Sequence, residues 1–490
     1  MNEESLPAII QGGMGVGVSG WRLARAVSRE GQLGVVSGTA LDVILARRLQ
    51  QGDPDGHVRR ALERFPFPGV AQRILDRYFI PGGKAPDEPF RPTPWPGATL
   101  SRHAQELAVA GNFVEVYLAR EGHAHLVGVN YLEKIQVTIL PSLYGAMLAG
   151  VHWVLVGAGI PRTIPGILDR LARGQPVELR LDVRNADSAE EHATRFDPLV
   201  FAGGDVPVLT RPRFAAIISS STLGTMLVRR SNGKVDGFVV EGHSAGGHNA
   251  PPRGPLQLTE QGEPIYGDRD VPDLEAIRSL GVPFWLAGSY AAPERLTEAL
   301  DAGAAGIQVG TAFAYCNESD LRPDLKIAVL RAIRSGTIGV LTDPLASPTG
   351  FPFKVVQLEH TLSDASAYDQ RPRLCDLAYL RHAYKNSHGT LGWRCPAEPL
   401  ADYLRKGGGD KETVGRKCLC NALLANIGLE QVRREGDHEL PLLTSGVDVA
   451  SVTQFLKAGT LSYSARDVID HLLSGANSLA PAVSSSSSGY

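Results

Sequence analysis

At residues 237–248 the chain reads Gly-Phe-Val-Val-Glu-Gly-His-Ser-Ala-Gly-Gly-His. The first part is a short apolar run typical of a buried strand, and the second is a turn of small residues that ends in a histidine. Gly246 and Gly247 allow the backbone to approach a large flat ligand closely. His248 follows the strand at its carboxyl end, where a neutral imidazole can take or hold a proton near neutral pH. The alternative interpretation is a purely structural histidine after a glycine turn.

Seven other short apolar runs share the features of this strand and are separated by helical patterns. The eight runs are 7–11, 33–37, 126–130, 153–156, 214–219, 237–241, 284–287 and 306–309. Each is followed by a turn rich in Gly, Ser or Asn, and usually then by a helix, which is typical of buried parallel strands. Eight such units predict an α/β fold of the (β/α)8 TIM-barrel class.

The chain has 490 residues and is therefore longer than a barrel requires, since a barrel takes about 250 residues. We expect the barrel to occupy residues 1–360, with large insertions at about 41–123 and 175–211. In the second insertion, the runs 177–183 and 206–209 predict a small hairpin. Residues 361–478 predict a mostly helical carboxyl-terminal region, with one of its helices at 375–385. The serine-rich segment 479–490 predicts a disordered tail.

The composition argues against several classes of protein. The chain carries 49 Lys and Arg against 52 Asp and Glu, a net charge of −3, which predicts neither a nucleic-acid partner nor a membrane-surface partner. From the sequence we expect neither a signal peptide in the first residues nor a membrane-spanning helix, because the apolar runs are too short to cross a membrane. Five cysteines, an odd number, occur without secretory features, so we expect a reducing, cytoplasmic location.

Four of the five cysteines gather in the last third of the chain: Cys375, Cys395, Cys418 and Cys420. Four thiolates can bind zinc tetrahedrally. However, the sequence lacks a C-x-x-C pair, and Cys418 and Cys420 stand very close together. This spacing is poor for a zinc site, and isolated buried cysteines are common. We therefore predict no metal site.

Residues 15–20, Gly-Val-Gly-Val-Ser-Gly, match the dinucleotide-binding pattern G-x-G-x-x-G. They follow a predicted strand and precede a predicted helix at 21–29, as that pattern requires. A dinucleotide-binding sheet also needs an acid at the end of its second strand. Here that strand ends in Ser37-Gly38-Thr39, and the first acid is Asp42. The missing acid and the large number of strands favour the barrel over an open dinucleotide-binding sheet.

The last two predicted strands end in small-residue turns that suit a phosphate group. In barrels, phosphate commonly binds after the seventh and eighth strands, on backbone N–H groups and a helix N-terminus. The first of these turns contains Gly288 and Ser289, and the second contains Gln308, Gly310 and Thr311. Gly-Ser and Gly-Thr can also simply end strands. Two such turns in succession predict a phosphate site at this end of the barrel.

Four motifs occur in the order, and at the strand ends, found in the nitronate monooxygenase family of FMN-dependent barrels, which this chain resembles. They are Gln-Gly-Gly-Met at 11–14, Gly-Val-Asn at 128–130, Ala-Gly-Gly-His at 245–248 and Gln-Val-Gly-Thr at 308–311. The resemblance extends to the related flavin-dependent enoyl-acyl-carrier-protein reductases and covers residues 5–360 apart from the insertions. One departure is Ser244, which stands where the family often has a glutamate.

The resemblance implies FMN as the cofactor and His248 as the catalytic residue. It implies that the backbone at Met14 lies against the flavin ring and that Asn130 forms a hydrogen bond with that ring. The full set of residues implied to bind FMN is Gly12, Gly13, Met14, Asn130, Ser219, Gly246, Gly247, Gly288, Ser289, Gln308, Gly310 and Thr311.

The resemblance leaves two activities open. An enzyme of the nitronate monooxygenase type would oxidise a small nitronate with O2, and His248 would orient or deprotonate the substrate. An enoyl-thioester reductase would use NAD(P)H as co-substrate and an acyl carrier protein as partner, and His248 would supply or guide a proton. A third interpretation is a flavin-binding regulatory or scaffold protein whose carboxyl-terminal region makes the contacts.

Overall fold

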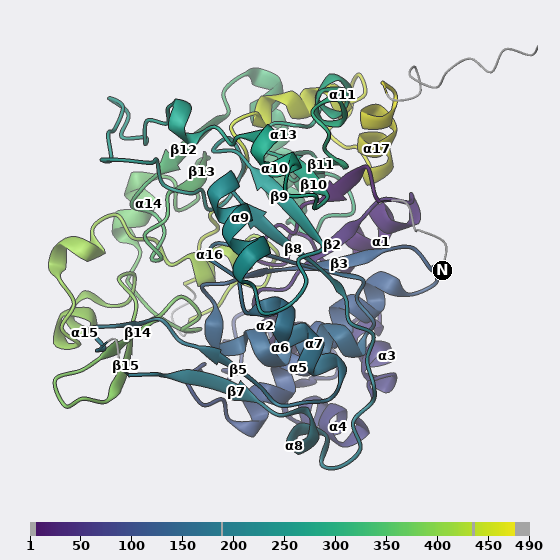
Figure 1. The fold of residues 1–490 in the computed structure, drawn as a ribbon. Helices are drawn as coiled ribbons and strands as arrows, with labels where there is room; N and C mark the ends of the chain where they lie inside the picture. Colours follow the sequence, from purple (N-terminus) through teal and green to yellow (C-terminus); the bar gives the residue numbers. More distant parts are fainter. Residues whose placement is uncertain (1–5, 188–189, 434–436, 476–490) are drawn as a thin grey trace, which may run out of the picture.

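The eight predicted strands all form and make one parallel sheet in the computed structural model, which describes residues 6–187, 190–433 and 437–475 (Figure 1). The strands are β1 (Ile9–Gln11), β2 (Gly34–Ser37), β3 (Val127–Leu132), β4 (Trp153–Gly157), β8 (Arg213–Ile218), β9 (Gly237–Glu241), β10 (Phe284–Ala287) and β11 (Gly306–Val309). Their spatial order is β1-β11-β10-β9-β8-β4-β3-β2. The two end strands meet at a parallel bridge between Ile10 and Leu33, where the Gln11 N–H donates to the Leu33 carbonyl over 2.9 Å. The sheet therefore closes into the predicted barrel, and an open dinucleotide-binding sheet is excluded.

Helices follow the strands and cover the outside of the barrel (Figure 1). They are α1 (Trp21–Arg29), α6 (Gln136–Leu148), α7 (Ile164–Ala172), α9 (Ser221–Arg230), α10 (Leu274–Arg278), α11 (Pro293–Asp301), α12 (Thr311–Ala314) and α13 (Pro323–Ser335). Because both faces of each strand are then covered, strands such as β4 are buried along their whole length. This is why the strands appear in the sequence as continuous apolar runs.

Two tryptophans fill the barrel interior at its amino-terminal end. Trp153 begins β4 and Trp285 lies near the start of β10, and their rings meet edge to face with centroids 5.6 Å apart. The Trp285 indole donates to the Pro7 carbonyl over 2.8 Å. A Cβ atom at Gly237 would lie 3.0 Å from the Trp285 ring, so only the smallest residue fits beside it. This end is a packed core, as is usual in such barrels, and a ligand site is left to the carboxyl-terminal end.

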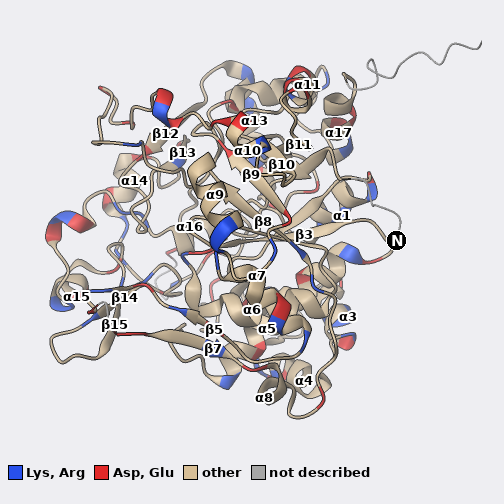
Figure 2. Ribbon diagram, in the orientation of Figure 1, with Lys and Arg blue, Asp and Glu red and all other residues tan. Residues whose placement is uncertain are grey.

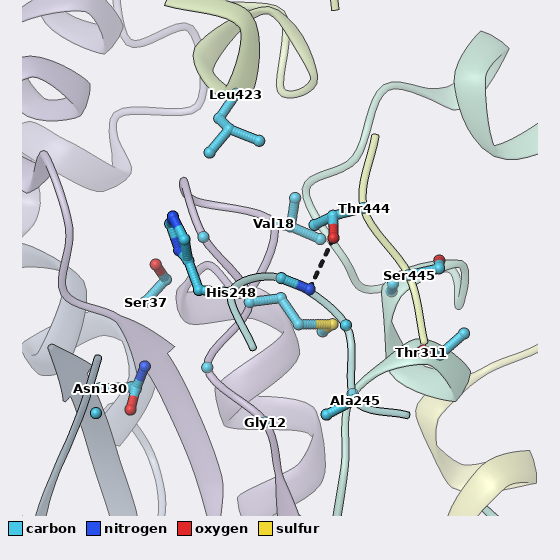
Figure 3. A pocket seen from close by; sticks show the side chains of 18 of the residues that line it. Gly12, Val18, Ser37, Asn130, Ala245, His248, Thr311, Leu423, Thr444 and Ser445 are labelled. Carbon is cyan, nitrogen blue, oxygen red and sulfur yellow. Dashed lines mark hydrogen bonds between the residues drawn. The ribbon is translucent and has the colours of Figure 1, made fainter. Parts of the chain in front are cut away.

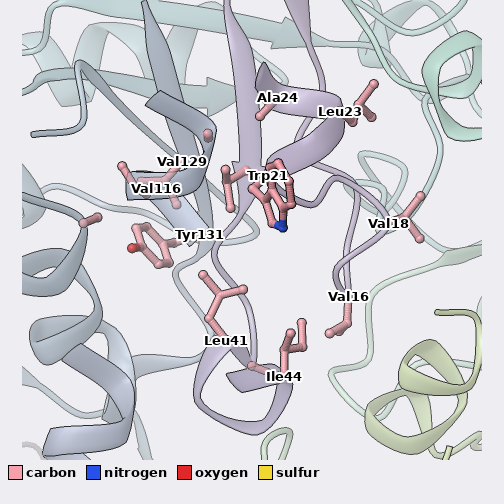
Figure 4. Packing of buried hydrophobic residues seen from close by; sticks show 14 of the residues in the cluster. Val16, Val18, Trp21, Leu23, Ala24, Leu41, Ile44, Val116, Val129 and Tyr131 are labelled. Atoms are coloured by element: carbon pink, nitrogen blue, oxygen red, sulfur yellow. The ribbon is translucent and has the colours of Figure 1, made fainter. Parts of the chain in front are cut away.

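The main hydrophobic core lies between the strands and the outer helices (Figure 4). Trp21, Leu23 and Ala24 of α1 are buried in it together with Val129 of β3. Each large apolar side chain buried in this way contributes about 1.5–3 kcal/mol. The packing of α1 on the sheet is very close, because a Cβ at Gly34 would lie only 1.9 Å from the Ala24 carbonyl oxygen.

Two segments add further elements between the barrel strands, one between β2 and β3 and one between α7 and β8. The first contains α2 (Leu41–Gln50), α3 (His57–Glu63), α4 (Pro68–Tyr78) and α5 (Arg102–Arg120). The second contains β5 (Val177–Arg180), β6 (Val183–Arg184), β7 (Ala193–Phe196) and α8 (Pro198–Ala202). β5 pairs antiparallel with β7, so the predicted pairing of 177–183 with 206–209 was wrong. Residues 206–209 form no strand.

The region after the barrel contains less helix than predicted. It begins after the antiparallel hairpin of β12 (Gly339–Asp343) and β13 (Phe353–Gln357). Its elements are α14 (Ala365–Gln370), β14 (His382–Lys385), β15 (Leu391–Arg394), α15 (Leu400–Arg405), α16 (Leu419–Ala425) and α17 (Ala465–Leu473), with short 3-10 turns and irregular chain between them. The predicted helix at 375–385 does not form, because its last residues, β14, pair with β15 and with β6.

The carboxyl-terminal region packs into the same core as the barrel: Leu419, Leu424 and Leu442 are buried in the main cluster. The predicted tail at 479–490 lies outside the described residues. Charged residues of both signs are scattered over the outer helices and loops (Figure 2). Among the helices described, none is long and apolar enough to cross a membrane.

Candidate functional site at the carboxyl-terminal end of the barrel

A cavity opens at the carboxyl-terminal ends of the eight strands, and we call it the inner cavity (Figure 3). It is lined by residues from every barrel strand or the turn after it. Twelve of the thirteen predicted site residues line it: Gly12, Gly13, Met14, Asn130, Gly246, Gly247, His248, Gly288, Ser289, Gln308, Gly310 and Thr311. Ser219 does not. It lies past the end of β8 and lines a neighbouring cavity, which His248 also lines.

The neighbouring cavity, called the outer cavity below, adjoins the inner one. It is lined by Lys134, Arg253, Tyr266 and Asp270, among others. The two cavities share Ala158, Ile217, Glu241 and His248. His248 and Glu241 therefore stand between them, and a molecule in either cavity can reach both side chains.

The turn after β1 is held in place by one buried serine. The Ser19 hydroxyl accepts from the Gln11 side-chain amide at 2.8 Å and from the Met14 N–H at 2.9 Å, and it donates to the Gly12 carbonyl at 3.0 Å. The Gly12 N–H donates to the Val309 carbonyl over 2.8 Å. These bonds fix the Gly-Gly-Met turn against β11 before any ligand binds.

Asn130 projects from β3 against this turn. A Cβ at Gly13 would lie 2.4 Å from the Asn130 Cβ, so the glycine is required for the two segments to approach. The Asn130 Oδ1 atom is buried and has no hydrogen-bond partner in the part of the chain that the structure describes. An unpaired buried oxygen costs about 1–3 kcal/mol. A ligand with an N–H group at this point would remove that cost.

The predicted phosphate turns also contain an unpaired polar atom. The Ser289 hydroxyl oxygen is buried and has no partner among the described residues. Gly288 has φ +94° and Ser289 has φ +59°, so this turn has a left-handed backbone that glycine adopts without strain. Next to it, a Cβ at Gly310 would meet the Met14 side chain at 3.8 Å. The first and last strands of the barrel thus contribute adjoining parts of one wall.

His248 is held on three sides. Its Nε2 lies 2.7 Å from the Ser347 hydroxyl oxygen, and its ring meets the Phe353 ring edge to face at 4.8 Å. Its backbone neighbours pair with the start of β13: the Lys354 N–H donates to the Gly247 carbonyl, and the Asn249 N–H to the Pro352 carbonyl, each over 2.9 Å. Burial lowers the pKa of His248 to about 4, so the imidazole is neutral at physiological pH.

Two other ionisable residues close to His248 in the sequence differ from it. Glu241, the last residue of β9, has its pKa raised to about 7 by burial, so it is partly protonated near neutral pH. It was not among the predicted site residues. His243 is exposed, stacks on Tyr266 with centroids 4.5 Å apart and lines only the outer cavity.

Part of the inner cavity is built by the carboxyl-terminal region, which the sequence analysis did not connect to the site. We call residues 444–448 the strap. The Gly247 N–H donates to the Thr444 hydroxyl over 2.8 Å (Figure 3), and the Gly446 N–H donates to the Thr311 hydroxyl over 2.9 Å. The Ser445 hydroxyl lies 2.5 Å from that of Tyr315. The strap therefore joins the Ala-Gly-Gly-His turn to the second predicted phosphate turn.

More of the wall comes from the same region, through the residues Leu377, Tyr379, Leu380, Leu419, Cys420, Leu423, Asn426 and Leu443. These residues are far apart in sequence and follow no periodic pattern that points to a ligand. The described residues contain no group of three or more His, Cys, Asp or Glu side chains placed to hold a metal ion. The five cysteines are all free thiols.

Residues 205–340 match the sequence model of the nitronate monooxygenase family, which confirms the resemblance over this stretch. It runs from just before β8 to the start of β12 and contains His248 and both predicted phosphate turns. A probable nitronate monooxygenase of Bacillus subtilis (strain 168) is 34% identical over 119 residues, which is 24% of this chain and 32% of that protein. The match thus spans about a third of the relative's length.

Several solved structures are similar over most of the chain. FabK from Thermotoga maritima has a TM-score of 0.47 and 16% identity, covering 97% of this chain and 94% of that chain. A nitroalkane oxidase from Streptomyces ansochromogenes has a TM-score of 0.41 and 15% identity, with coverages of 96% and 97%. The enoyl reductase domain of MlnA from the macrolactin biosynthesis cluster of Bacillus amyloliquefaciens has a TM-score of 0.47 and 12% identity, with coverages of 96% and 94%. At these scores the likeness supports no inference about activity.

Proposed function

We propose that this chain, which matches the nitronate monooxygenase family over residues 205–340, is an FMN-dependent oxidoreductase that oxidises a small nitronate with O2. One observation carries the proposal: a glycine-lined cavity at the carboxyl-terminal end of the barrel has buried, unpaired oxygens on Asn130 and Ser289, at the ends of two barrel strands, and a neutral histidine in its wall.

The positions of the unpaired Asn130 and Ser289 oxygens fit FMN. Asn130 lies in the second half of β3 and Ser289 follows β10, and these strands are four apart in the ring of eight, so they face each other across the barrel. A ligand that satisfies both atoms must span the mouth, with a polar ring edge at one end and a phosphate at the other. The glycines between them leave room for a flat ring. FMN has this shape, and when bound it would supply the redox chemistry, taking electrons from the substrate and passing them to oxygen.

His248 is suited to orienting the substrate. Because its pKa is about 4, removing a proton from a weak carbon acid at neutral pH would be unfavourable for it. A neutral imidazole can still donate or accept a hydrogen bond. The described residues give Nε2 a partner in Ser347 and give Nδ1 none, so we assign Nδ1 to the substrate. A nitronate is already an anion and needs orientation rather than deprotonation.

A second candidate is the reduction of an enoyl thioester by NAD(P)H, and the outer cavity favours it. This cavity meets the inner one at His248, and two basic residues, Lys134 and Arg253, line it together with four acidic ones, Glu133, Asp182, Glu241 and Asp270. A small nitronate does not need such an extension, whereas a long thioester arm or a nicotinamide nucleotide carries phosphates that basic side chains bind. In this reaction His248 would guide a proton to the substrate, and an acyl carrier protein would be the partner.

Assays of the FMN-loaded protein with both substrate classes test the proposal. Oxygen uptake and nitrite release with propyl-2-nitronate support the first function. Oxidation of NADH or NADPH that depends on a crotonyl thioester supports the second. Bound FMN with neither activity would favour a regulatory or scaffold role, and a protein that does not take up FMN would contradict both enzymatic proposals.

A further inference from the structure

We infer that Ser347 is a positioning residue for His248 and decides whether its Nδ1 acts as a hydrogen-bond donor or acceptor. Ser347 is 0% exposed and lines neither cavity, so it does not touch a substrate. Its hydroxyl oxygen lies 2.7 Å from His248 Nε2. The inference rests on the proposed role of His248, and the experiment below distinguishes a failure of one from a failure of the other.

The loop that carries Ser347 is fixed from outside the site. This loop joins β12 to β13. Arg416 donates to the Ser347 carbonyl over 2.6 Å and to the Leu345 carbonyl over 2.7 Å. The backbone bonds between the start of β13 and residues 247–249 tie the loop to the histidine turn. The hydroxyl and the imidazole are therefore both held, and their contact does not depend on a freely rotating surface side chain.

Ser347 is itself paired with a second hydroxyl. Its oxygen lies 2.8 Å from the Thr349 hydroxyl oxygen and accepts from the Thr349 N–H at 3.2 Å. A serine has one proton to donate. If Thr349 donates its hydroxyl proton to Ser347, then Ser347 donates to Nε2, and the ring proton of neutral His248 is on Nδ1. If Ser347 donates to Thr349, then Nε2 carries the ring proton and Nδ1 is an acceptor.

The pair of hydroxyls thus supports both tautomers of the neutral imidazole without movement of a heavy atom. Nδ1 as a donor suits a nitronate oxygen or a thioester carbonyl, and Nδ1 as an acceptor suits a substrate proton. Without the Ser347 hydroxyl, the buried Nε2 would lose its partner, and neither tautomer would be held. The expected effect is on turnover, since the cavity walls that bind the substrate remain in place.

The chain offers a matched control in the next turn. The hydroxyls of Thr361 and Ser363 also lie 2.8 Å apart, and the Ser363 N–H donates to the Thr361 hydroxyl at 3.2 Å. This pair lines neither cavity. Ser363→Ala therefore also removes one hydroxyl of such a pair, at the position that Thr349 occupies in the first pair, together with the bonds of that hydroxyl to the Leu358 backbone, but away from His248.

The experiment compares full-length, FMN-loaded Ser347→Ala, Ser347→Thr, Ser363→Ala and His248→Ala with wild type, using whichever substrate is turned over. Ser347→Ala should lower kcat by about 10- to 100-fold with little change in KM, a part of the roughly 10²–10⁴-fold that general acid–base help provides. The acidic limb of its pH profile should move to lower pH, because a hydroxyl that accepts from the imidazolium favours the charged form. Ser347→Thr keeps the hydroxyl and should recover most of the rate, and Ser363→Ala should match wild type.

Wild-type kcat and an unshifted pH profile in folded, FMN-loaded Ser347→Ala would overturn the inference, and so would an equal loss in Ser363→Ala. If Ser347→Ala does not fold, Thr349→Val decides: a lowered kcat with FMN bound supports the inference, and a wild-type rate overturns it. Full activity in His248→Ala would instead contradict the proposed role of the histidine. Loss of activity in His248→Ala with a normal rate in Ser347→Ala would contradict only the role of Ser347.

Discussion

Replacing Asn130 by alanine should weaken FMN binding without destabilising the ligand-free protein. The Asn130 Oδ1 is buried and unpaired in the described structure, so its removal breaks no hydrogen bond of the ligand-free fold and removes a desolvation cost of about 1–3 kcal/mol. In the complex, the same change removes one hydrogen bond and leaves a buried flavin group unpaired. That loss is again about 1–3 kcal/mol, which raises the Kd for FMN by roughly 5- to 150-fold.

Asn112 provides the control for this prediction. It is also a buried asparagine, but its side chain is satisfied: it donates to the Ala108 carbonyl over 2.8 Å and accepts from the Tyr131 hydroxyl over 2.7 Å. Asn112→Ala should therefore lower the free energy of unfolding, by about 1–3 kcal/mol, and leave FMN affinity nearly unchanged. The measurements are fluorescence titration of the apoprotein with FMN and urea unfolding of the same apoproteins. Unchanged FMN affinity in Asn130→Ala, or a loss of apoprotein stability as large as in Asn112→Ala, would refute the reasoning.

Three further predictions concern the strap, Glu241 at the end of β9, and the two histidines that follow it. In Gly446→Val, the new Cβ would lie 2.7 Å from the Asp448 carboxylate and 3.1 Å from the Thr311 hydroxyl, so the strap must shift. FMN should then dissociate faster in stopped-flow measurements. An unchanged dissociation rate would show that the strap does not hold the cofactor. Glu241 has a folded-state pKa of about 7, above its unfolded value, so its ionisation destabilises the fold increasingly as the pH rises from the unfolded pKa to the folded one. In urea unfolding, Glu241→Gln should therefore raise the free energy of unfolding by about 1–3 kcal/mol at pH 8 and by almost nothing at pH 4. An equal effect at both pH values would contradict this. His248→Ala should keep its FMN and lose about 10²–10⁴-fold in turnover. His243→Ala, in the outer cavity, should turn over substrate at close to the wild-type rate. Equal effects of the two variants on steady-state rates would argue against a special role for His248.

The barrel could be predicted from the sequence because its strands are short and buried on both faces. A run such as 153–156 has no polar alternation, and the turn after each strand is marked by Gly, Ser or Asn. The helix at 375–385 was predicted wrongly because local composition was the only guide there. Pairing with β15 and β6, which are remote in sequence from each other, decides the conformation instead.

The same contrast applies to the site. The predicted residues that line the inner cavity lie at or just after the ends of barrel strands, and the geometry of a parallel barrel brings all strand ends to one face. Ser219 lines the outer cavity and not the inner one, because a strand end fixes the height of a residue in the barrel but not the direction of its side chain. Ser347 and the strap could not be found, because they reach the site through loops that carry no periodic pattern, and their contacts span about 100 to 200 residues of sequence.

The most direct test of the account is the identity and amount of flavin bound to the purified protein. After incubation with FMN and removal of the excess, the protein should be yellow, and denaturation should release close to one FMN per chain and no FAD. This follows from the single cavity that holds both the Asn130 oxygen and the phosphate turns. A colourless protein that takes up no flavin, or one that releases FAD, would contradict the assignment of this cavity to FMN.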